Sequence, residues 1–277
     1  MDNPLVSVII PTKNSSRTLE ACLKSIKNQS YKNIELIVVD NNSTDDTKEI
    51  AKKYTDKVFN YGPERSAQVN YGVTKASGKY VYKVDSDFVL DDKVVEQCVA
   101  EAAKGYDAIV VHNSPDVTVS WIAKVRKFEV DMYKYDLTHS SARFIKREVH
   151  AKIGGFNEKI IAGEDYDFQN KLNRSGYKTG FIEAEALHLG EPKSFWKHMK
   201  KYYHYGKNFV NYVQENKQEA PQQLGFFRGV YAKNWKKFIE HPILSLEFLI
   251  YNIFKFGFGG AGYLAGRESG ARKSILK

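Results

Sequence analysis

The chain has 277 residues, of which 42% are hydrophobic and 13% aromatic. This apolar content is enough to bury the core of one large domain, or of one domain with an appendage, and it excludes a disordered chain. The formal net charge of +9 suits a nucleic acid, an anionic membrane surface or a phosphate-bearing substrate as a partner.

Strand and helix signals alternate through the first half of the chain. Short apolar runs predict strands at residues 5–11, 34–39, 57–60, 80–84 and 108–112. Amphipathic segments predict helices at residues 17–29, 65–76 and 91–104, and a further helix that opens at a cap in 43–46 and runs to residue 53. This alternation predicts an α/β fold with a mostly parallel sheet and helices on both faces, whose ligands bind beyond the carboxyl ends of the strands.

The second half of the chain is less regular. Residues 121–134, 163–175 and 195–214 have helical patterns, and residues 140–145 and 177–182 have strand patterns. We place the domain boundary in residues 214–223, because this segment contains Pro221 and precedes an aromatic tail.

A few features bear on cellular location. Cys22 and Cys98 fall in apolar helical patterns, so we expect two buried thiols, as suits a reducing compartment. The N-terminus shows no signal peptide. No window of about 20 residues is free of charge, so no classical membrane-spanning helix is expected. These features predict a cytoplasmic protein.

Two carboxylates follow the fourth expected strand, in Asp85-Ser86-Asp87. Carboxylates at i and i+2 just past a strand can converge on one hard divalent cation, which keeps positions open for substrate phosphates and neutralises a diphosphate leaving group. The alternative is a solvated turn, the usual setting of this short pattern. Its position at the end of an apolar strand favours the metal site.

Another carboxylate, Asp40, ends the second expected strand. In nucleotide-binding sheets an acid at this place commonly accepts hydrogen bonds from a base or ribose. The alternative is that Asp40 caps the following helix, although Asn41, Asn42 and Ser43 can supply that cap. The chain has neither a Gly-x-Gly-x-x-Gly after the first strand nor a P-loop, which disfavours a dinucleotide cofactor and a P-loop nucleotide site.

The acidic pair Glu164-Asp165 opens an expected helix. Acids at a helix start are often only caps that the helix dipole favours. An enzyme that transfers a group to a hydroxyl, however, needs one carboxylate to take the proton. Asp40, Asp85 and Asp87 would be occupied with the donor and the metal, which leaves this pair for that role.

Six segments in this order resemble glycosyltransferase family 2, across residues 5–206. Each segment is short, but six in register make a specific signal. The segments are Ser7-Val8-Ile9-Ile10-Pro11-Thr12-Lys13-Asn14, Val38-Val39-Asp40-Asn41-Asn42-Ser43-Thr44-Asp45, Arg65-Ser66-Ala67-Gln68-Val69-Asn70-Tyr71-Gly72, Asp85-Ser86-Asp87, Gly154-Gly155-Phe156 and Gly163-Glu164-Asp165-Tyr166-Asp167. The resemblance implies an inverting reaction by direct displacement, in a fold that joins a nucleotide-binding half-sheet to an acceptor half.

The resemblance also implies roles for single residues. Pro11, Thr12, Asn14 and Asp40 would lie around the nucleoside of the donor. Arg65 and Asn70 would lie near its base or diphosphate, and Ser86 would also bind the donor. Asp87 would hold Mn²⁺ or Mg²⁺, with Asp85 toward the ribose or the metal. Asp165 would be the catalytic base, with Glu164 toward the acceptor or the donor sugar. His188 matches a position that approaches the metal in some relatives, although a lone histidine is more often structural.

The sequence departs from one branch of the family. Processive polysaccharide synthases carry Gln-x-x-Arg-Trp after the base, and this chain does not, so single-sugar transfer is favoured. The resemblance favours UDP over GDP in the donor. We expect a catalytic domain at residues 1–215, with a nucleotide-sugar half at 1–112 and an acceptor half at 113–215, followed by a helical region at 216–277.

The C-terminal region is basic and aromatic. Lysines alternate with aromatic residues in 195–214, and residues 226–264 form an apolar tail in which several glycines are expected to break the helix. The tail packs on its own domain, on another subunit or into one membrane leaflet. We expect peripheral contact with an anionic membrane on its cytoplasmic face, and a lipid-linked or glycan acceptor. Glu247 and Lys255 argue for a helix that lies in the interface rather than spans it.

The sequence is also compatible with two other functions. A polyprenyl phosphate acceptor, as in relatives that resemble dolichyl-phosphate mannosyltransferase, needs little deprotonation near neutral pH, so Asp165 would matter less there. A catalytically silent nucleotide-sugar or membrane-binding protein is a further alternative, against which the intact acidic pairs argue. No nucleic-acid recognition module is present, so nucleic acid is not expected as a partner.

Overall fold

The computed structural model describes residues 3–275, with side chains as far as Ser269. The chain forms two compact units. The first contains the chain up to Ser114, together with Ser140–Glu158 and Phe168–Gly190. The second contains Pro115–His139, Lys159–Asp167 and the chain from Glu191 onward.

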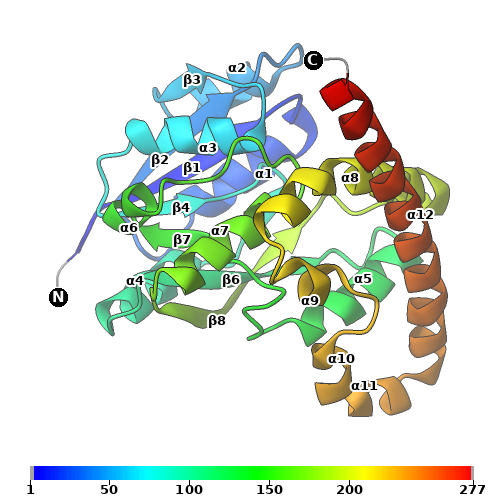
Figure 1. Cartoon of the computed structure of the whole chain (residues 1–277). Helices are drawn as coiled ribbons and strands as arrows, with labels where there is room; N and C mark the ends of the chain where they lie inside the picture. Colours follow the sequence, from blue (N-terminus) through cyan, green and yellow to red (C-terminus); the bar gives the residue numbers. More distant parts are fainter. Residues whose placement is uncertain (1–2, 276–277) are drawn as a thin grey trace. The chain divides into compact units, whose positions relative to one another are not determined.

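The first unit holds an eight-stranded sheet in the order β3-β2-β1-β4-β7-β6-β8-β5 (Figure 1). Its strands are β1 (Val6–Thr12), β2 (Ile34–Asp40), β3 (Val58–Asn60), β4 (Tyr80–Lys83), β5 (Phe88–Leu90), β6 (Ala108–Pro115), β7 (Phe144–Lys146) and β8 (Thr179–His188). The four strands β3, β2, β1 and β4 are parallel, which confirms the parallel sheet expected for the first half of the chain. The pairings of β4 with β7, of β6 with β7 and of β5 with β8 are antiparallel, so the whole sheet is mixed.

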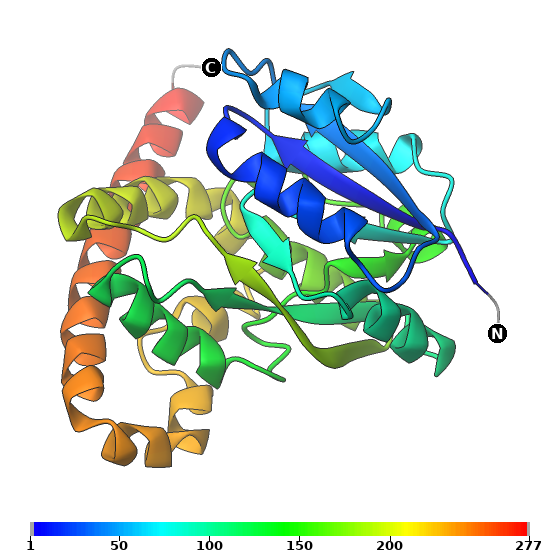
Figure 2. The ribbon, with the colours of Figure 1, turned by 180° about the vertical axis from the view of Figure 1, so that it is seen from behind.

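Helices cover both faces of this sheet (Figures 1 and 2). The helices of the first unit are α1 (Ser16–Lys27), α2 (Thr47–Lys52), α3 (Arg65–Thr74), α4 (Val94–Ala103) and α6 (Arg147–Lys152), and α7 (Glu164–Arg174) begins in the second unit and ends in the first. Every residue of β1 is buried, because successive side chains alternate between the two covered faces.

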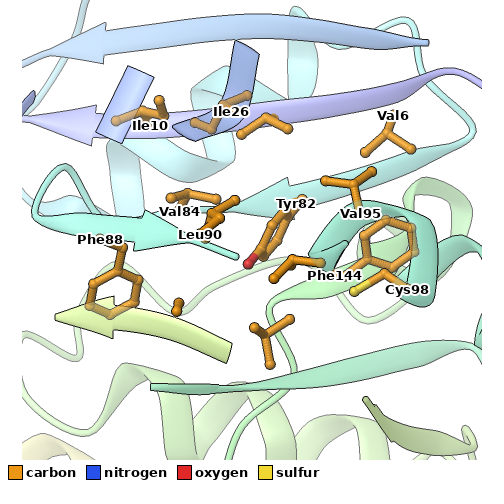
Figure 3. Close-up of a cluster of buried hydrophobic side chains, with 14 of the residues drawn as sticks. Val6, Ile10, Ile26, Tyr82, Val84, Phe88, Leu90, Val95, Cys98 and Phe144 are labelled. Atoms are coloured by element: carbon orange, nitrogen blue, oxygen red, sulfur yellow. The ribbon is translucent and has the colours of Figure 1, made fainter. Parts of the chain in front are cut away.

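The main core lies between the sheet and the helices α1 and α4 (Figure 3). Val6 and Ile10 of β1 point into it, together with Ile26 of α1 and Cys98 of α4. On the opposite face Gly72 of α3 lies so close to Ile9 that a Cβ at position 72 would come within 2.5 Å of the isoleucine side chain. Both cysteines are buried free thiols, as expected.

Two short elements were not expected from the sequence. β5 and α6 have only three and six residues, too few to show a period of their own. β8 is longer than expected and continues to His188, where it pairs with Phe88 of β5. This pairing exists only in the tertiary structure, and it brings the residue before β5, Asp87, next to the end of β8.

The described part of the second unit consists largely of helices. They are α5 (Trp121–Met132), α8 (Phe195–Glu215), α9 (Ala220–Leu224), α10 (Gly229–Lys233), α11 (Trp235–Glu240) and α12 (Pro242–Ile275). Their shared core contains Val125 and Phe128 of α5, Met199 of α8, and Phe248 and Tyr251 of α12.

The expectation that the glycines near the C-terminus break the helix is wrong, because α12 runs through them without interruption. These glycines let α12 approach α8 closely. A Cβ at Gly262 would lie 2.0 Å from the carbonyl oxygen of Tyr203, and a Cβ at Gly206 would lie 2.0 Å from that of Gly259. Such backbone contact, which small residues permit, offsets the poor helix propensity of glycine.

Within the described chain, the helical segment Pro242–Ser269 is long and apolar enough to cross a membrane by length and composition alone. Only 17% of its most apolar window is buried. The prediction that the chain has no such segment is therefore wrong. Glu247 and Lys255 interrupt the segment, but it still has the length and the apolar composition of a helix that could cross a membrane.

Candidate active site

The expected donor-binding residues follow the carboxyl ends of the parallel strands. Thr12 ends β1 and lies opposite Asp40, which ends β2. Asp85 follows β4, the other neighbour of β1. The parallel register therefore brings three separate sequence segments to one edge of the sheet.

The Asp40 carboxylate is buried and makes several hydrogen bonds within the protein. It accepts bonds from the Thr12 hydroxyl at 3.1 Å, the Ser43 backbone N–H at 2.8 Å and the Ser43 hydroxyl at 2.5 Å. Lys48 Nζ lies 3.5 Å away. The structure thus shows Asp40 bonded to Ser43 in the turn after β2, whereas α2 begins only at Thr47 with Asp46 at its N-cap, so Asp40 does not cap that helix. Its role toward a nucleoside stays a prediction.

The loops after β1 and β2 are bonded to each other. Asn14 has a positive φ of 49°, its side-chain oxygen accepts from the Thr44 N–H, and its own N–H donates to the Ser43 hydroxyl. Gln68 of α3 donates to the carbonyl oxygens of Thr12 and Val39. These contacts fix the backbone around Pro11, Thr12 and Asn14.

Asp85 is bracketed by two arginines. Arg143 Nη1 lies 2.7 Å from Asp85 Oδ2, and Arg65 Nη1 lies 3.6 Å from Asp85 Oδ1. Burial disfavours the charged carboxylate, but attraction to Arg143, Arg65 and Lys83 outweighs it and holds the pKa of Asp85 well below its usual range. Asp85 is therefore ionised and paired with cationic side chains.

The other two members of the motif have different partners. The Ser86 hydroxyl is bonded to that of Ser15, just before α1, at 2.9 Å. Asp87 Oδ2 lies 3.1 Å from His188 Nε2. Both groups are partly exposed, with relative side-chain exposures of 32% for Asp87 and 20% for His188, so solvent reaches the pair.

The pair formed by Asp87 and His188 suits a metal ion. A Cβ at Gly190 would lie 2.2 Å from Asp87 Oδ2 and 2.8 Å from His188 Nε2, so only glycine lets the backbone pass this close to both side chains without displacing them. Two neighbouring ligands of an octahedral ion, each at about 2.1 Å, lie about 3.0 Å apart, close to the observed 3.1 Å. One carboxylate and one imidazole fit Mg²⁺ or Mn²⁺, whose other positions water and substrate phosphates fill.

Asp85 does not complete a three-residue site with them. Among the side chains of residues 3–269 no group of three His, Cys, Asp or Glu is arranged to hold a metal. The residues present therefore fit an ion with two protein ligands.

Replacing Gly190 with alanine is expected to weaken Mn²⁺ binding about 10–100-fold, the range seen when the surroundings of a metal ligand are disturbed. The added methyl group would collide with Asp87 and His188 and displace both side chains. Titration of the free protein, with unbound Mn²⁺ followed by electron paramagnetic resonance, measures this change. Gly229→Ala is the matched control, because nothing lies within 4 Å of a Cβ at that position. Unchanged affinity in Gly190→Ala would place the ion elsewhere.

Asn70 holds a loop of the same unit. Its side-chain amide donates to the Phe156 carbonyl oxygen and to Glu158, and its side-chain oxygen accepts from the Phe156 N–H. The amide thereby fixes the Gly154-Gly155-Phe156 segment. Its expected place near a base or diphosphate stays a prediction.

The acidic pair lies in the second unit, in the first turn of α7. Glu164 is buried and Asp165 is partly exposed. The preceding Gly163 has a φ of 87°, and a Cβ there would come within 2.9 Å of both Phe209 and Tyr212 of α8. Glycine is thus required both by the backbone conformation and by the close approach of α8.

A hydrogen bond to α8 also orients this turn. Asp167, two residues after Asp165, accepts a bond of 2.9 Å from the side chain of Asn216, and both residues are buried. Asn216 follows the C-terminal end of α8 and is a positioning residue that the sequence did not indicate. The one feature of the sequence that could have indicated it is its place, as a polar residue at the end of a long amphipathic helix.

Comparison with known proteins extends these observations. The family model described as glycosyl transferase family 2 matches residues 7–157. An uncharacterized glycosyltransferase of Methanocaldococcus jannaschii is 27% identical, over 92% of each chain. One from Rickettsia typhi is 29% identical over 62% of this chain, which spans only 59% of that relative's length. A GalNAc(5)-diNAcBac-PP-undecaprenol beta-1,3-glucosyltransferase of Campylobacter jejuni is 37% identical over 37% of this chain and 36% of its own.

The fold is similar to that of solved glycosyltransferases. The mannosyltransferase PcManGT from Pyrobaculum calidifontis, solved in complex with GDP-Man and Mn²⁺, matches with a TM-score of 0.61 and 17% identity, over all of this chain and 81% of its own. At this identity the match supports the fold alone. The bound Mn²⁺ and GDP-Man are properties of the Pyrobaculum enzyme.

Proposed function

Since the chain belongs to glycosyl transferase family 2 and is a glycosyltransferase, we propose that it moves a single sugar from a UDP-linked donor to an acceptor hydroxyl with inversion, using Mn²⁺ or Mg²⁺ at Asp87 and His188. The observation that carries this proposal is the pair formed by Asp87 Oδ2 and His188 Nε2, which lie 3.1 Å apart and are both partly exposed, as suits neighbouring ligands of one ion. It lies at the carboxyl end of the sheet, where α/β folds bind nucleotides.

In this reaction Asp165 accepts the proton of the acceptor hydroxyl, which then attacks the anomeric carbon while the bond to the nucleotide diphosphate breaks. Glu164 contacts the acceptor or the donor sugar. Arg65 contributes positive charge toward the diphosphate, and the loops of Thr12 and Asn14 hold the nucleoside. A divalent ion, when bound, supplies charge that stabilises the leaving diphosphate.

The nucleotide of the donor has two candidates. The family resemblance favours UDP, whereas the Pyrobaculum enzyme was solved with GDP-Man. A thermal-shift screen of UDP- and GDP-sugars, with and without Mn²⁺, tests both. We expect stabilisation by one nucleotide sugar that requires the ion, because a ligand that binds only the folded state raises the unfolding temperature. Hydrolysis of that donor then separates an enzyme from a silent binding protein.

For the acceptor we propose a lipid-linked glycan. The support is the Campylobacter relative, whose name includes an undecaprenol diphosphate substrate, and the apolar surface of α12 described below. The alternative acceptor is a polyprenyl phosphate, which requires no strong base.

The exposed surface of α12 supports contact with a membrane. Its outward stripe is apolar over several turns and contains Ile243, Leu246, Leu249, Ile250, Ile253, Phe254 and Leu264. Before it, Lys233, Lys236 and Lys237 flank the exposed Trp235 of α11. Apolar groups between basic residues suit an anionic membrane surface, with rings and lysines at the headgroups.

The opposite side of α12 supports an orientation within the plane of the membrane interface. Lys255 Nζ lies 2.7 and 2.8 Å from the two carboxylate oxygens of Glu129 on α5, and the glycine face of α12 packs on α8. A spanning orientation would carry the lysines of α8 into the bilayer core at a high cost. We therefore place the protein peripherally, on the cytoplasmic face of the membrane.

We expect full-length protein to co-sediment with anionic liposomes, with partial release by salt, because both apolar insertion and headgroup attraction contribute. Replacing Leu246, Ile250 and Ile253 with glutamate should reduce the bound fraction at least about tenfold, because three charges are placed on the inserted stripe. Ala21, Asn28 and Ser175 are exposed positions of the first unit. Glutamates at these three sites give a control with the same charge change. Equal loss in both variants would refute insertion of α12 and leave only long-range charge attraction.

A further inference from the structure

We propose that the exposed basic face of α8 binds the diphosphate of a lipid-linked acceptor, at a distance from the turn that carries Asp165. This face consists of Lys197, Lys200, Lys201 and His204. The inference rests on the transferase and the lipid-linked acceptor proposed above. It goes beyond them because it assigns the residues that bind the diphosphate, and because it requires a glycan between that diphosphate and the hydroxyl that receives the sugar.

The four side chains of the basic face lie on one side of α8. Their positions are three or four residues apart, the spacing of neighbours on a helix surface, and all four are exposed. Between Glu191 and Glu215 the chain has no acidic residue, and none of the three lysines forms an ion pair with a side chain in residues 3–269. The basic face therefore keeps uncompensated positive charge, which attracts a phosphate-bearing ligand.

The opposite side of α8 is packed within the second unit. Gly206 lies against the backbone of Gly259 in α12, and α8 lies beside that helix (Figure 2). His198 Nε2 lies 3.0 Å from the hydroxyl oxygen of Tyr251, also in α12. Because His198 and Gly206 are buried, these contacts fix the rotation of α8 about its axis, with the basic face toward solvent.

An exposed tryptophan connects the basic face to the apolar stripe of α12. Trp196, which precedes Lys197, is 60% exposed and packs edge-on against Phe254, with ring centres 5.9 Å apart. Phe254 belongs to the stripe that is proposed above to enter the membrane. Tryptophan favours the level of the headgroups, so the first turns of α8 would lie at the depth where a membrane-held lipid carrier has its phosphates.

The charge of this face favours a diphosphate over an ordinary phospholipid headgroup. Three lysines within two turns of α8 carry more positive charge than one phosphodiester neutralises. A diphosphate presents several anionic oxygens to them, and lysine binds phosphates well as a point charge. The geometry therefore fits the diphosphate of a polyprenyl carrier, the kind of substrate named for the Campylobacter relative.

The far end of the same helix contacts the segment that leads to the proposed base. Asn211 donates to the Lys159 carbonyl oxygen at 2.7 Å, and Gly163, two residues before Asp165, packs against the same end of α8. Asn211 lies about 16 Å along the helix axis from Lys200, at about 1.5 Å per residue. A phosphate bound at the basic face is therefore not the group that Asp165 deprotonates, and a glycan fits the length between them.

The test is co-sedimentation of the full-length protein with phosphatidylcholine vesicles that contain undecaprenyl diphosphate. Reference vesicles contain phosphatidylglycerol instead, at the same total charge. Replacing Lys197, Lys200 and Lys201 with glutamine should weaken binding to the undecaprenyl diphosphate vesicles at least about tenfold, because three charges that meet the diphosphate are lost. Binding to the reference vesicles should change less than about threefold, since the stripe of α12 and the lysines before it remain.

The matched control replaces three exposed lysines of the first unit, Lys27, Lys52 and Lys53, with glutamine. It removes the same charge and should change binding to either kind of vesicle less than about twofold, as expected for surface substitutions. Equal loss on both kinds of vesicle in the α8 variant would make the basic face a general headgroup contact and overturn the inference. Binding of that variant like the original protein would overturn it as well.

Two measurements on the original protein do not depend on the folding of a variant. It should bind the undecaprenyl diphosphate vesicles more tightly than the reference vesicles, and equal binding would contradict a diphosphate site. With the donor found by the thermal-shift screen, undecaprenyl phosphate should receive no sugar, and product on that carrier would contradict the separation from Asp165. Failure of the proposed function is seen separately, as absence of both stabilisation by nucleotide sugars and donor hydrolysis.

Discussion

Replacing Asp87 with alanine is expected to lower donor turnover at least about a hundredfold, because charge stabilisation by a catalytic metal is worth several kcal/mol. Asp87 is the partly exposed carboxylate that pairs with His188 and lies against the backbone of Gly190. Without it, the proposed ion keeps a single protein ligand and the leaving diphosphate lacks compensating charge. Turnover measured over a range of Mn²⁺ concentrations should show the loss.

The control for this variant is Asp92→Ala, which removes an exposed carboxylate beyond β5 without disturbing the site. Its turnover should remain within about twofold of the original, as expected for surface substitutions. A second treatment tests the same idea without mutation, because a chelator should abolish activity and added Mn²⁺ should restore it. Full activity in the chelator would remove the metal from the mechanism.

Replacing Asp165 with asparagine is expected to lower sugar transfer about 10²- to 10⁴-fold, the usual contribution of a general base. Asparagine keeps the shape of the side chain at the start of α7 but cannot take a proton from the acceptor. Donor affinity should stay nearly constant, since the donor-binding residues proposed here lie in other segments. Single-turnover transfer and donor binding, measured separately, distinguish the two quantities.

Asp46→Asn is a matched control, because Asp46 is also an aspartate at a helix start, immediately before α2. It loses only the favourable interaction of an anion with the helix dipole, worth about 0.3–1 kcal/mol. Near-normal transfer by Asp165→Asn, with unchanged donor affinity, would contradict a hydroxyl acceptor. It would favour a polyprenyl phosphate, whose oxygen is already deprotonated.

The sequence by itself determined the parallel half of the fold and the family. Apolar runs that stop at Thr12, Asp40 and Asp85 indicated where strands end, since a buried strand needs apolar side chains on both faces. Short-range patterns of this kind depend only on neighbouring residues and on solvent, so they can be recognised in the sequence alone. The same reasoning found the helix that begins at Glu164, because caps and glycines act within one turn.

Only the tertiary structure decided which partners these residues have. Arg143 lies 58 residues from Asp85 along the chain, and His188 lies 101 residues from Asp87, so no local pattern relates the members of either pair. The same holds for α12: the sequence shows its glycines as helix breakers, and their contact with α8 makes them compatible with one long helix. Propensity is a weak local term, and the packing of distant segments outweighs it once the chain is folded.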